Sequence, residues 1–160
     1  MKIQVREARA ADFDGLVALF GKENELHAQL VPAYIQTTPH VLTRKELQAF
    51  LDSRTHRLFV CEDGYTLLGA VIVALQETVE DRWNKPRLCG YIEDLIVTAS
   101  ARGRGVGRQL MQAARRWVMA QGVQTIELHV WEVNTGAHHF YESLGLQTVQ
   151  RRMTWELDVE

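Results

Sequence analysis

The sequence has no acidic residue between Asp94 and Glu127, although 20 of its 160 residues are Asp or Glu. This interval carries a charge of +5, while the whole chain carries −2, which leaves −7 for the remainder. Five cations without a neighbouring anion favour an anionic ligand at this place. The net negative charge argues against a dedicated nucleic-acid-binding protein, which is basic overall. The five cations are Arg102, Arg104, Arg108, Arg115 and Arg116.

Long apolar runs and cysteine clusters are also lacking. The longest apolar run, residues 67–75, is too short to span a bilayer, and residues 1–6 contain no apolar core of a signal peptide. Cys61 and Cys89 do not have the spacing of zinc ligands, and their apolar surroundings predict buried thiols. These features predict a single cytoplasmic domain over residues 1–160, without a metal site.

Hydrophobic patterning predicts a mixed sheet with helices packed on it, an α/β (α+β) fold. The continuous apolar run within residues 66–79 predicts a strand buried on both faces. Residues 21–42 are expected to be irregular or partly helical. The expected helices cover residues 11–20, 43–51, 106–118 and 135–144, and the expected strands cover residues 2–6, 57–62, 66–79, 88–98, 125–131 and 153–157.

A glycine-punctuated loop joins the expected strand 88–98 to the expected helix 106–118. Gly103, Gly105 and Gly107 remove side chains where the loop becomes a helix, and the first amides of a helix point outward unpaired. These amides and the positive end of the helix dipole favour a phosphate, and the loop's arginines add charge-assisted contacts. The spacing matches neither the Walker loop nor the dinucleotide fingerprint. The alternative is a glycine-rich turn with a solvated arginine face.

Two segments resemble motifs of one known family. Arg102-Gly-Arg-Gly-Val-Gly107 resembles the Arg/Gln-x-x-Gly-x-Gly/Ala signature of the Gcn5-related N-acetyltransferases (GNAT). Asn134 and the run Phe140-Tyr141-Glu-Ser-Leu-Gly145 resemble that family's later motif, in the same order and at the usual distance. The resemblance is specific over residues 88–146. It implies a GNAT-like acyl-CoA N-acyltransferase fold, with a central, mostly antiparallel sheet flanked by helices.

The resemblance implies that the chain binds acetyl-CoA and transfers the acetyl group to an amine. The loop would cradle the diphosphate, and the strand before it would pair with the pantetheine arm while one of its amides polarises the thioester carbonyl. Asn134, Ala137 and Tyr141 share one face of a helix, where the asparagine would hydrogen-bond the cofactor. The expected cofactor-binding residues are Leu95, Ile96, Val97, Arg102, Gly103, Arg104, Gly105, Val106, Gly107, Arg108, Asn134, Ala137 and Tyr141.

Two residues are expected to be catalytic. Tyr141 would protonate the departing thiolate, although it can equally be a packed aromatic residue. Glu93 matches the position of a catalytic glutamate in members that acetylate small amines, and it would take the proton of the acceptor ammonium. The alternative for Glu93 is a structural ion pair or a hydrogen bond with a backbone amide. His129 is a second candidate for base or relay.

The neighbouring Asp94 is expected to be structural or to bind the amine. Regular alternation places Tyr91, Glu93, Leu95 and Val97 on one strand face and Asp94 on the other, unless a bulge intervenes. An acid in an apolar strand is costly when it is buried without a partner. Such residues are therefore usually paired or functional.

Acceptor specificity is expected in residues 21–42 and 80–87, because irregular segments carry binding variation. The Ile92-Glu93-Asp94 resemblance favours a small-molecule amine as acceptor. The alternatives are a protein N-terminus or lysine, and a non-catalytic acyl-CoA-binding module. Neither nucleic acid nor a membrane is an expected partner, whereas the family often forms homodimers. The candidate pocket residues, each of which can equally be solvated or packed, are Glu23, Glu25, His27, Tyr34 and Trp83.

Overall fold

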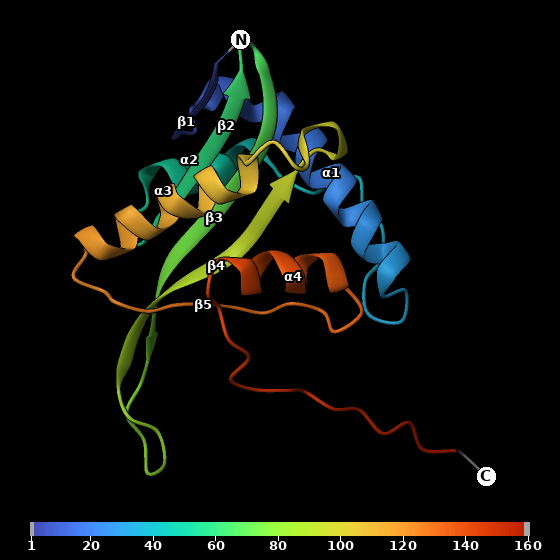
Figure 1. The fold of residues 1–160 in the computed structure, drawn as a ribbon, viewed down its shortest axis with the longest axis vertical. Coiled ribbons are helices and arrows are strands. Elements are labelled where there is room, and N and C mark those ends of the chain that lie inside the picture. Colours follow the sequence, from blue (N-terminus) through green and yellow to red (C-terminus); the bar gives the residue numbers. More distant parts are fainter. Residues whose placement is uncertain (1, 159–160) are drawn as a thin grey trace. The chain divides into compact units, whose positions relative to one another are not determined.

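A five-stranded sheet in the order β1-β2-β3-β4-β5 is the centre of the first part of the chain (Figure 1). The computed structural model describes residues 2–158, which form two compact units, Met1–His129 and Val130–Glu160. The first four strands pair antiparallel, and β5 pairs parallel with β4. This confirms the expected mixed, mostly antiparallel sheet. The strands are β1 (Ile3–Glu7), β2 (His56–Asp63), β3 (Thr66–Thr78), β4 (Arg87–Val97) and β5 (Ile126–Leu128).

Three α-helices accompany the sheet in the first unit, and one lies in the second. The first helix continues ten residues beyond the predicted end at residue 20, because residues 22–30 contain no proline and are mostly good helix formers. Residues 21–42 are thus partly helical, as expected. The helices are α1 (Phe13–Leu30), α2 (Arg44–Asp52), α3 (Val106–Ala120) and α4 (Thr135–Ser143), with short 3-10 turns η1 (Ala10–Asp12) and η2 (Ala99–Ala101).

The two faces of the sheet are covered by different helices. Apolar residues of α1 and α2 form one core with Leu58, Val60, Ile72 and Ile96 of the strands. On the opposite face, α3 crosses the strands at close range (Figure 1). A Cβ atom on Gly69 would lie 2.5 Å from the carbonyl oxygen of Ile96 and 3.1 Å from Leu110 of α3. The sheet therefore has a dedicated α1/α2 face and a dedicated α3 face.

Two strand predictions near the C-terminus are wrong. β5 covers only Ile126–Leu128, because its ladder with β4 ends after three residue pairs. Residues 147–158 form no strand, and Met153, Trp155 and Leu157 are 89%, 86% and 71% exposed. Alternation alone does not make a strand, since a strand also needs a partner for its backbone groups. No helix among the described residues is both long and apolar enough to cross a bilayer.

Candidate active site

A β-bulge in β4 brings two consecutive carboxylates to the α1/α2 face of the sheet. Asp94 pairs with Ile72 of β3 and Ile92 pairs with Val73, so Glu93 is an extra residue with no partner. Bulges shift the alternation of a strand by one residue. Asp94 therefore shares the face of Tyr91, and the regular alternation that placed Glu93 with Tyr91, Leu95 and Val97 is corrected at this point.

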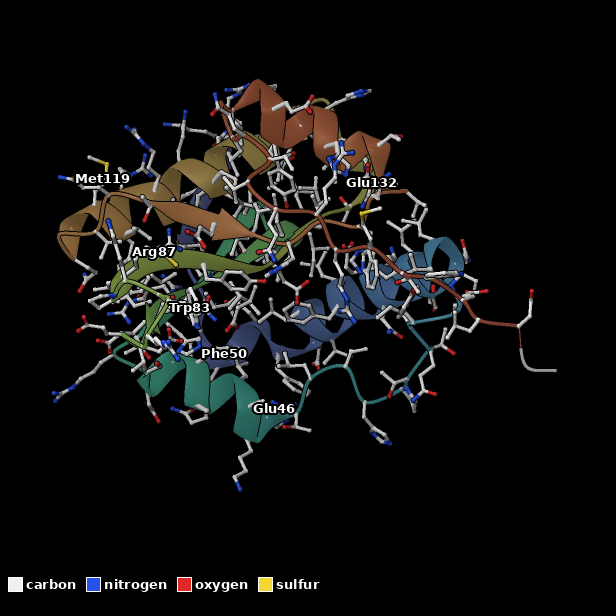
Figure 2. All side chains as sticks on the ribbon, turned by 90° about the horizontal axis from the view of Figure 1, so that it is seen from below. Glu46, Phe50, Trp83, Arg87, Met119 and Glu132 are labelled. Atoms are coloured by element: carbon white, nitrogen blue, oxygen red, sulfur yellow. The ribbon has the colours of Figure 1, made fainter. Side chains whose placement is uncertain are left out.

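Both carboxylates line a pocket of about 480 Å³ on this face, a volume within the range of small-molecule sites. Part of its wall comes from α2, which contributes Glu46 and Phe50 (Figure 2). Half of the lining side chains are apolar, and the other half are polar or charged. The lining residues are Phe20, Val41, Leu42, Glu46, Ala49, Phe50, Ser53, Thr55, His56, Ile72, Glu93 and Asp94.

Glu93 is held by a histidine from a strand that is not its neighbour. His56, the first residue of β2, places Nε2 3.3 Å from Glu93 Oε1. The other ring nitrogen, Nδ1, lies 3.1 Å from the hydroxyls of Ser53 and Thr55. Nδ1 can accept a hydrogen bond from a hydroxyl while Nε2–H donates to the carboxylate. The imidazole, placed between the hydroxyls and the carboxylate, fixes the orientation of Glu93.

Asp94 has a very different environment, although it is the adjacent residue. Within residues 2–158 its carboxylate makes no hydrogen bond and no ion pair, and it is partly buried. Burial raises its pKa from 3.8 to about 6, an effect that the negative charges of Glu23 and Glu93 reinforce and that His27 opposes. Asp94 is therefore a carboxylate that changes charge near neutral pH.

Two residues of α1 complete this acidic region. Glu23 Oε1 lies 3.4 Å from His27 Nε2, one helical turn away. Burial raises the pKa of Glu23, and the positive charge of Arg102 opposes that rise. Both residues were candidates from the sequence, and both lie close enough to Asp94 to influence its pKa. Glu23 thus connects the acidic region electrostatically with the arginine loop.

The loop after β4 has the backbone that phosphate binding requires. Gly103 and Gly105 have φ values of +75° and +79°, which glycine adopts without strain. The first described α-helical hydrogen bond of α3 runs from the amide of Gln109 to the carbonyl of Gly105, so the amides of Val106, Gly107 and Arg108 precede it and have no backbone acceptor in the described chain. These three amides lie at the N-terminus of α3, the positive end of the helix dipole.

The arginines of this loop differ in their contacts. Arg104 lies 3.3 Å from Asp63 at the end of β2, so it is already engaged in an ion pair. Arg102 and Arg108 are exposed, as are Arg115 and Arg116 farther along α3. The last two lie two turns or more beyond the loop, and their exposure indicates that they are solvated. Arg102 and Arg108 are the loop arginines best able to reach an anion.

The end of β4 has an open edge. β5 pairs with β4 only from Gly90 to Ile92, whereas β3 continues to pair with β4 up to Val97. In the described part of the first unit, the backbone groups of residues 95–97 on the β5 side therefore have no strand beside them. An extended ligand can use such an edge in the manner of an added strand.

The later motif lies in the second unit. Asn134 caps α4, because its Oδ1 accepts a hydrogen bond of 3.2 Å from the amide of Ala137. Asn134, Ala137 and Tyr141 are spaced by three and four residues and share one face of the helix, as expected. The ring of Tyr141 also packs edge-on against Phe140, with 5.3 Å between the centroids.

Other candidates lie outside the pocket. His129 Nδ1 lies 2.6 Å from the hydroxyl of Tyr91, and neither residue lines the pocket. Trp83, at the tip of the β3–β4 hairpin, is 86% exposed. Cys61 and Cys89 are buried as predicted, and burial raises the pKa of both thiols, which disfavours the nucleophilic thiolate. In residues 2–158 no three His, Cys, Asp or Glu side chains are grouped as a metal would need.

Sequence reasoning missed the α2 side of the pocket. His56, Phe50 and Ser53 carry no motif, and they meet β4 only because β2 and β4 flank β3. One signal was present, since His56 lies two residues before the apolar run 58–61. The contact between His56 and Glu93 could not be deduced without the register of three strands.

Comparisons with known proteins agree with this architecture. The BH1408 protein from Bacillus halodurans, in a crystal structure of its tetramutant, is 26% identical, with a TM-score of 0.89 over 96% of this chain and 99% of that one. The aminoglycoside N-acetyltransferase AAC(6')-Iy, solved with a bisubstrate analogue containing CoA, is 17% identical, with a TM-score of 0.72 over 99% and 100% of the two chains. Glucosamine-6-phosphate N-acetyltransferase from Arabidopsis thaliana gives the same identity, TM-score and coverage.

No curated protein matches the sequence. The family model described as acetyltransferase (GNAT) family matches residues 24–146, a span that begins in α1 and ends just after α4. That span contains the bulged strand, the arginine loop and the later motif, so the match rests on the same elements as the site. This chain belongs to the GNAT acetyltransferase family.

Proposed function

We propose that this protein transfers the acetyl group of acetyl-CoA to a primary amine of a small molecule, by direct attack while both substrates are bound. The observation that carries the proposal is the pair of carboxylates that the β4 bulge directs into a pocket of about 480 Å³. Such a pair attracts an ammonium and can accept its proton. We propose further that residues 1–160 work as one catalytic domain.

The residues present fit acetyl-CoA. The unpaired amides of Val106, Gly107 and Arg108 suit a diphosphate, and the open edge of β4 at residues 95–97 suits an amide-containing arm. When bound, acetyl-CoA supplies an acetyl group activated as a thioester. The proposed binding set also includes the loop residues from Arg102 to Gly105 and, on the strength of the later motif, Asn134, Ala137 and Tyr141.

In the proposed mechanism the two carboxylates have separate roles. Asp94, charged above about pH 6, attracts and orients the acceptor ammonium. Glu93 takes the proton, and the imidazole of His56, 3.3 Å from its Oε1, keeps the carboxylate oriented. The amide of Ile96 or Val97 polarises the thioester carbonyl. Tyr141 donates a proton to the thiolate that leaves.

Two features favour a small molecule over a protein as acceptor. The pocket, lined by side chains of α1, α2 and the sheet, has a volume of about 480 Å³, which is within the range of small-molecule sites. The similar structures include enzymes named for aminoglycosides and for glucosamine-6-phosphate, which are small-molecule amines. A non-catalytic acyl-CoA-binding module would keep the arginine loop without needing the carboxylates. A cytoplasmic, homodimeric enzyme is the expected cellular form.

The proposal is tested in two steps with the full chain. Saturating acetyl-CoA must raise the melting temperature, because a ligand that binds only the folded state stabilises it. Release of CoA is then followed with a panel of amines, for the wild type, Glu93→Gln and Tyr141→Phe. We expect each substitution to lower kcat by roughly 10²- to 10⁴-fold while acetyl-CoA still stabilises the protein. The variant Arg115→Gln, on the exposed side of α3, is the matched control and should retain wild-type kinetics.

Stabilisation by acetyl-CoA with no amine-dependent release of CoA would favour the binding module. Absence of stabilisation at saturating acetyl-CoA would refute the proposal as a whole.

A further inference from the structure

We propose that the acceptor is an arylalkylamine, meaning a primary amine with a single positive charge on a short chain attached to an aromatic or similarly flat apolar body. This inference rests on the proposed function and assigns a substrate class to the pocket beside Glu93. It depends on the distribution of apolar and charged groups around that pocket. Each feature is a property of residues in the first unit.

Half of the residues that line the pocket are apolar, and one of them, Ile72, lies directly beside Asp94. Phe20 from α1, Phe50 from α2 and Ile72 from β3 form the apolar walls, together with Val41 and Leu42 from the segment before α2. Phe50 also packs edge-on against the ring of His56, with 5.8 Å between the centroids. An aromatic ring therefore lies beside the residue that contacts Glu93. Aromatic rings favour offset or edge-on contact with other rings. The walls thus suit a flat apolar body.

The carboxylates of the pocket suit one ammonium. Glu93 and Asp94 are adjacent, so their charges act at the same place rather than at separate points. The third lining carboxylate, Glu46, is engaged with the amide and hydroxyl of Thr43 at the start of α2. A ligand with several ammonium groups would therefore find a counter-charge for one of them and an apolar wall for the rest.

The lining also disfavours phosphorylated and polyhydroxylated acceptors. None of the lining residues that the structure describes is lysine or arginine, and the only potentially cationic one, His56, is paired with Glu93. A phosphate placed beside Glu93 and Asp94 would be repelled. The lining hydroxyls of Ser53 and Thr55 already contact His56, so few groups remain to bond the hydroxyls of a sugar.

The test measures CoA release by the full-length protein with saturating acetyl-CoA and a matched panel of acceptors. The panel pairs 2-phenylethylamine and tryptamine with ethylamine, which lacks the apolar body, and adds glucosamine-6-phosphate, kanamycin and a lysine-containing peptide. We expect kcat/KM for the two arylalkylamines to exceed that of every other acceptor by at least about tenfold. A higher kcat/KM for the sugar phosphate, kanamycin or the peptide would overturn the substrate class while leaving acetyl transfer intact.

Two variants test the apolar wall directly. Phe50→Ala should raise KM for 2-phenylethylamine about tenfold, a clearly larger effect than it has on KM for ethylamine. Ala49→Phe places a ring in the pocket from an exposed position of α2, so it should fold, and it should abolish acetylation of tryptamine while ethylamine remains a substrate. Trp83→Ala, at the exposed hairpin tip, is the control that should change neither. Equal effects on ethylamine and the arylalkylamines would refute the assignment, whereas no CoA release with any amine would refute the proposed function itself.

Discussion

His56 of β2 and Glu93 of β4 are joined across the intervening strand β3, with 3.3 Å between the imidazole Nε2 and the carboxylate Oε1. A regular β4 would have no residue at this place, because Glu93 is the extra residue of the bulge. The contact therefore links the first residue of one strand to an irregularity in another. His56 acts on the chemistry through Glu93, which makes it a positioning residue.

Replacing His56 separates this role from a merely structural one. We expect His56→Ala to lower kcat about tenfold with little change in KM for the amine, since Glu93 loses the contact that orients it. His56→Gln, which can still donate a hydrogen bond to the carboxylate, should recover most of the loss. Steady-state kinetics of both variants check this, and equal losses in the two would contradict the positioning role.

Asp94 should control the affinity for the amine through its charge. Its pKa of about 6 means that it becomes negative as the pH rises through that value, and the attraction for an ammonium appears at the same time. We expect KM for the amine to fall as the pH rises from 5 to 7. Asp94→Asn should raise KM at pH 7.5 and remove this pH dependence, with kcat changed less than in Glu93→Gln. Initial rates across this pH range provide the test.

The same group should make the protein less stable as the pH rises. Because the folded state raises the pKa of Asp94 from 3.8 to about 6, the folded protein binds this proton more tightly than the unfolded chain does. The resulting contribution to the free energy of unfolding falls between about pH 4 and pH 6 and is then constant. Asp94→Asn should therefore gain up to about 3 kcal/mol relative to the wild type above pH 6, and nearly nothing at pH 4. Urea unfolding at both pH values measures the difference.

Gly105 should be needed for both the loop and the cofactor. Its φ of +79° costs a residue with a Cβ roughly 1–2 kcal/mol, although no atom lies within 4 Å of the position where that Cβ would be. We expect Gly105→Ala to lose about that much stability and to weaken binding of acetyl-CoA, since the amides after it are displaced. Gly21→Ala, in α1 with equally open space and no positive φ, is the control and should not lose stability. Calorimetry and acetyl-CoA titration distinguish the two.

Gly90 should be required for the packing of α3 on the sheet. A Cβ at this position of β4 would overlap a methyl group of Val118, and Val118 is only 1% exposed. Gly90→Ala should lower the free energy of unfolding by about 1–3 kcal/mol, the usual cost of overpacking a core. The double variant Gly90→Ala with Val118→Ala should recover part of this loss. A double-mutant cycle in denaturant checks the coupling, and simple additivity of the two losses would contradict it.

Most of the sheet was predictable because the hydrophobic pattern of its residues follows their burial. The apolar run of β3 reflects burial on both faces. The apolar stripe predicted for α3 is Val106, Leu110, Ala114, Trp117 and Val118, and all of these are buried except Trp117, which is half-buried. The arginine loop was predictable for a different reason, since positive φ angles and free amides depend on a short stretch of sequence. These are local properties, and local sequence is enough to specify them.

The features that were not predictable depend on pairing between strands. The bulge at Glu93 exists only relative to β3, and it decides which face Asp94 occupies. At residues 153–157 a strand was predicted where none exists. Met153, Trp155 and Leu157 have the alternation of a strand, but no neighbouring strand pairs with them in the described structure. Asp94 was a candidate from the sequence, but its raised pKa could not be predicted, because it arises from burial and from the charge of Glu23 on a distant helix, opposed by His27.

The bulge has one more consequence, which concerns changes of chain length. Deleting a residue from a central strand normally moves every later side chain of that strand to the opposite face of the sheet. At residue 93 the reverse holds, because removing the unpaired residue would bring Ile92 and Asp94 together opposite Val73 and Ile72, which already face them. The strand would become regular while Ile96 stayed in its core position. A one-residue deletion at this position thus removes the acid while the later residues of β4 keep their faces.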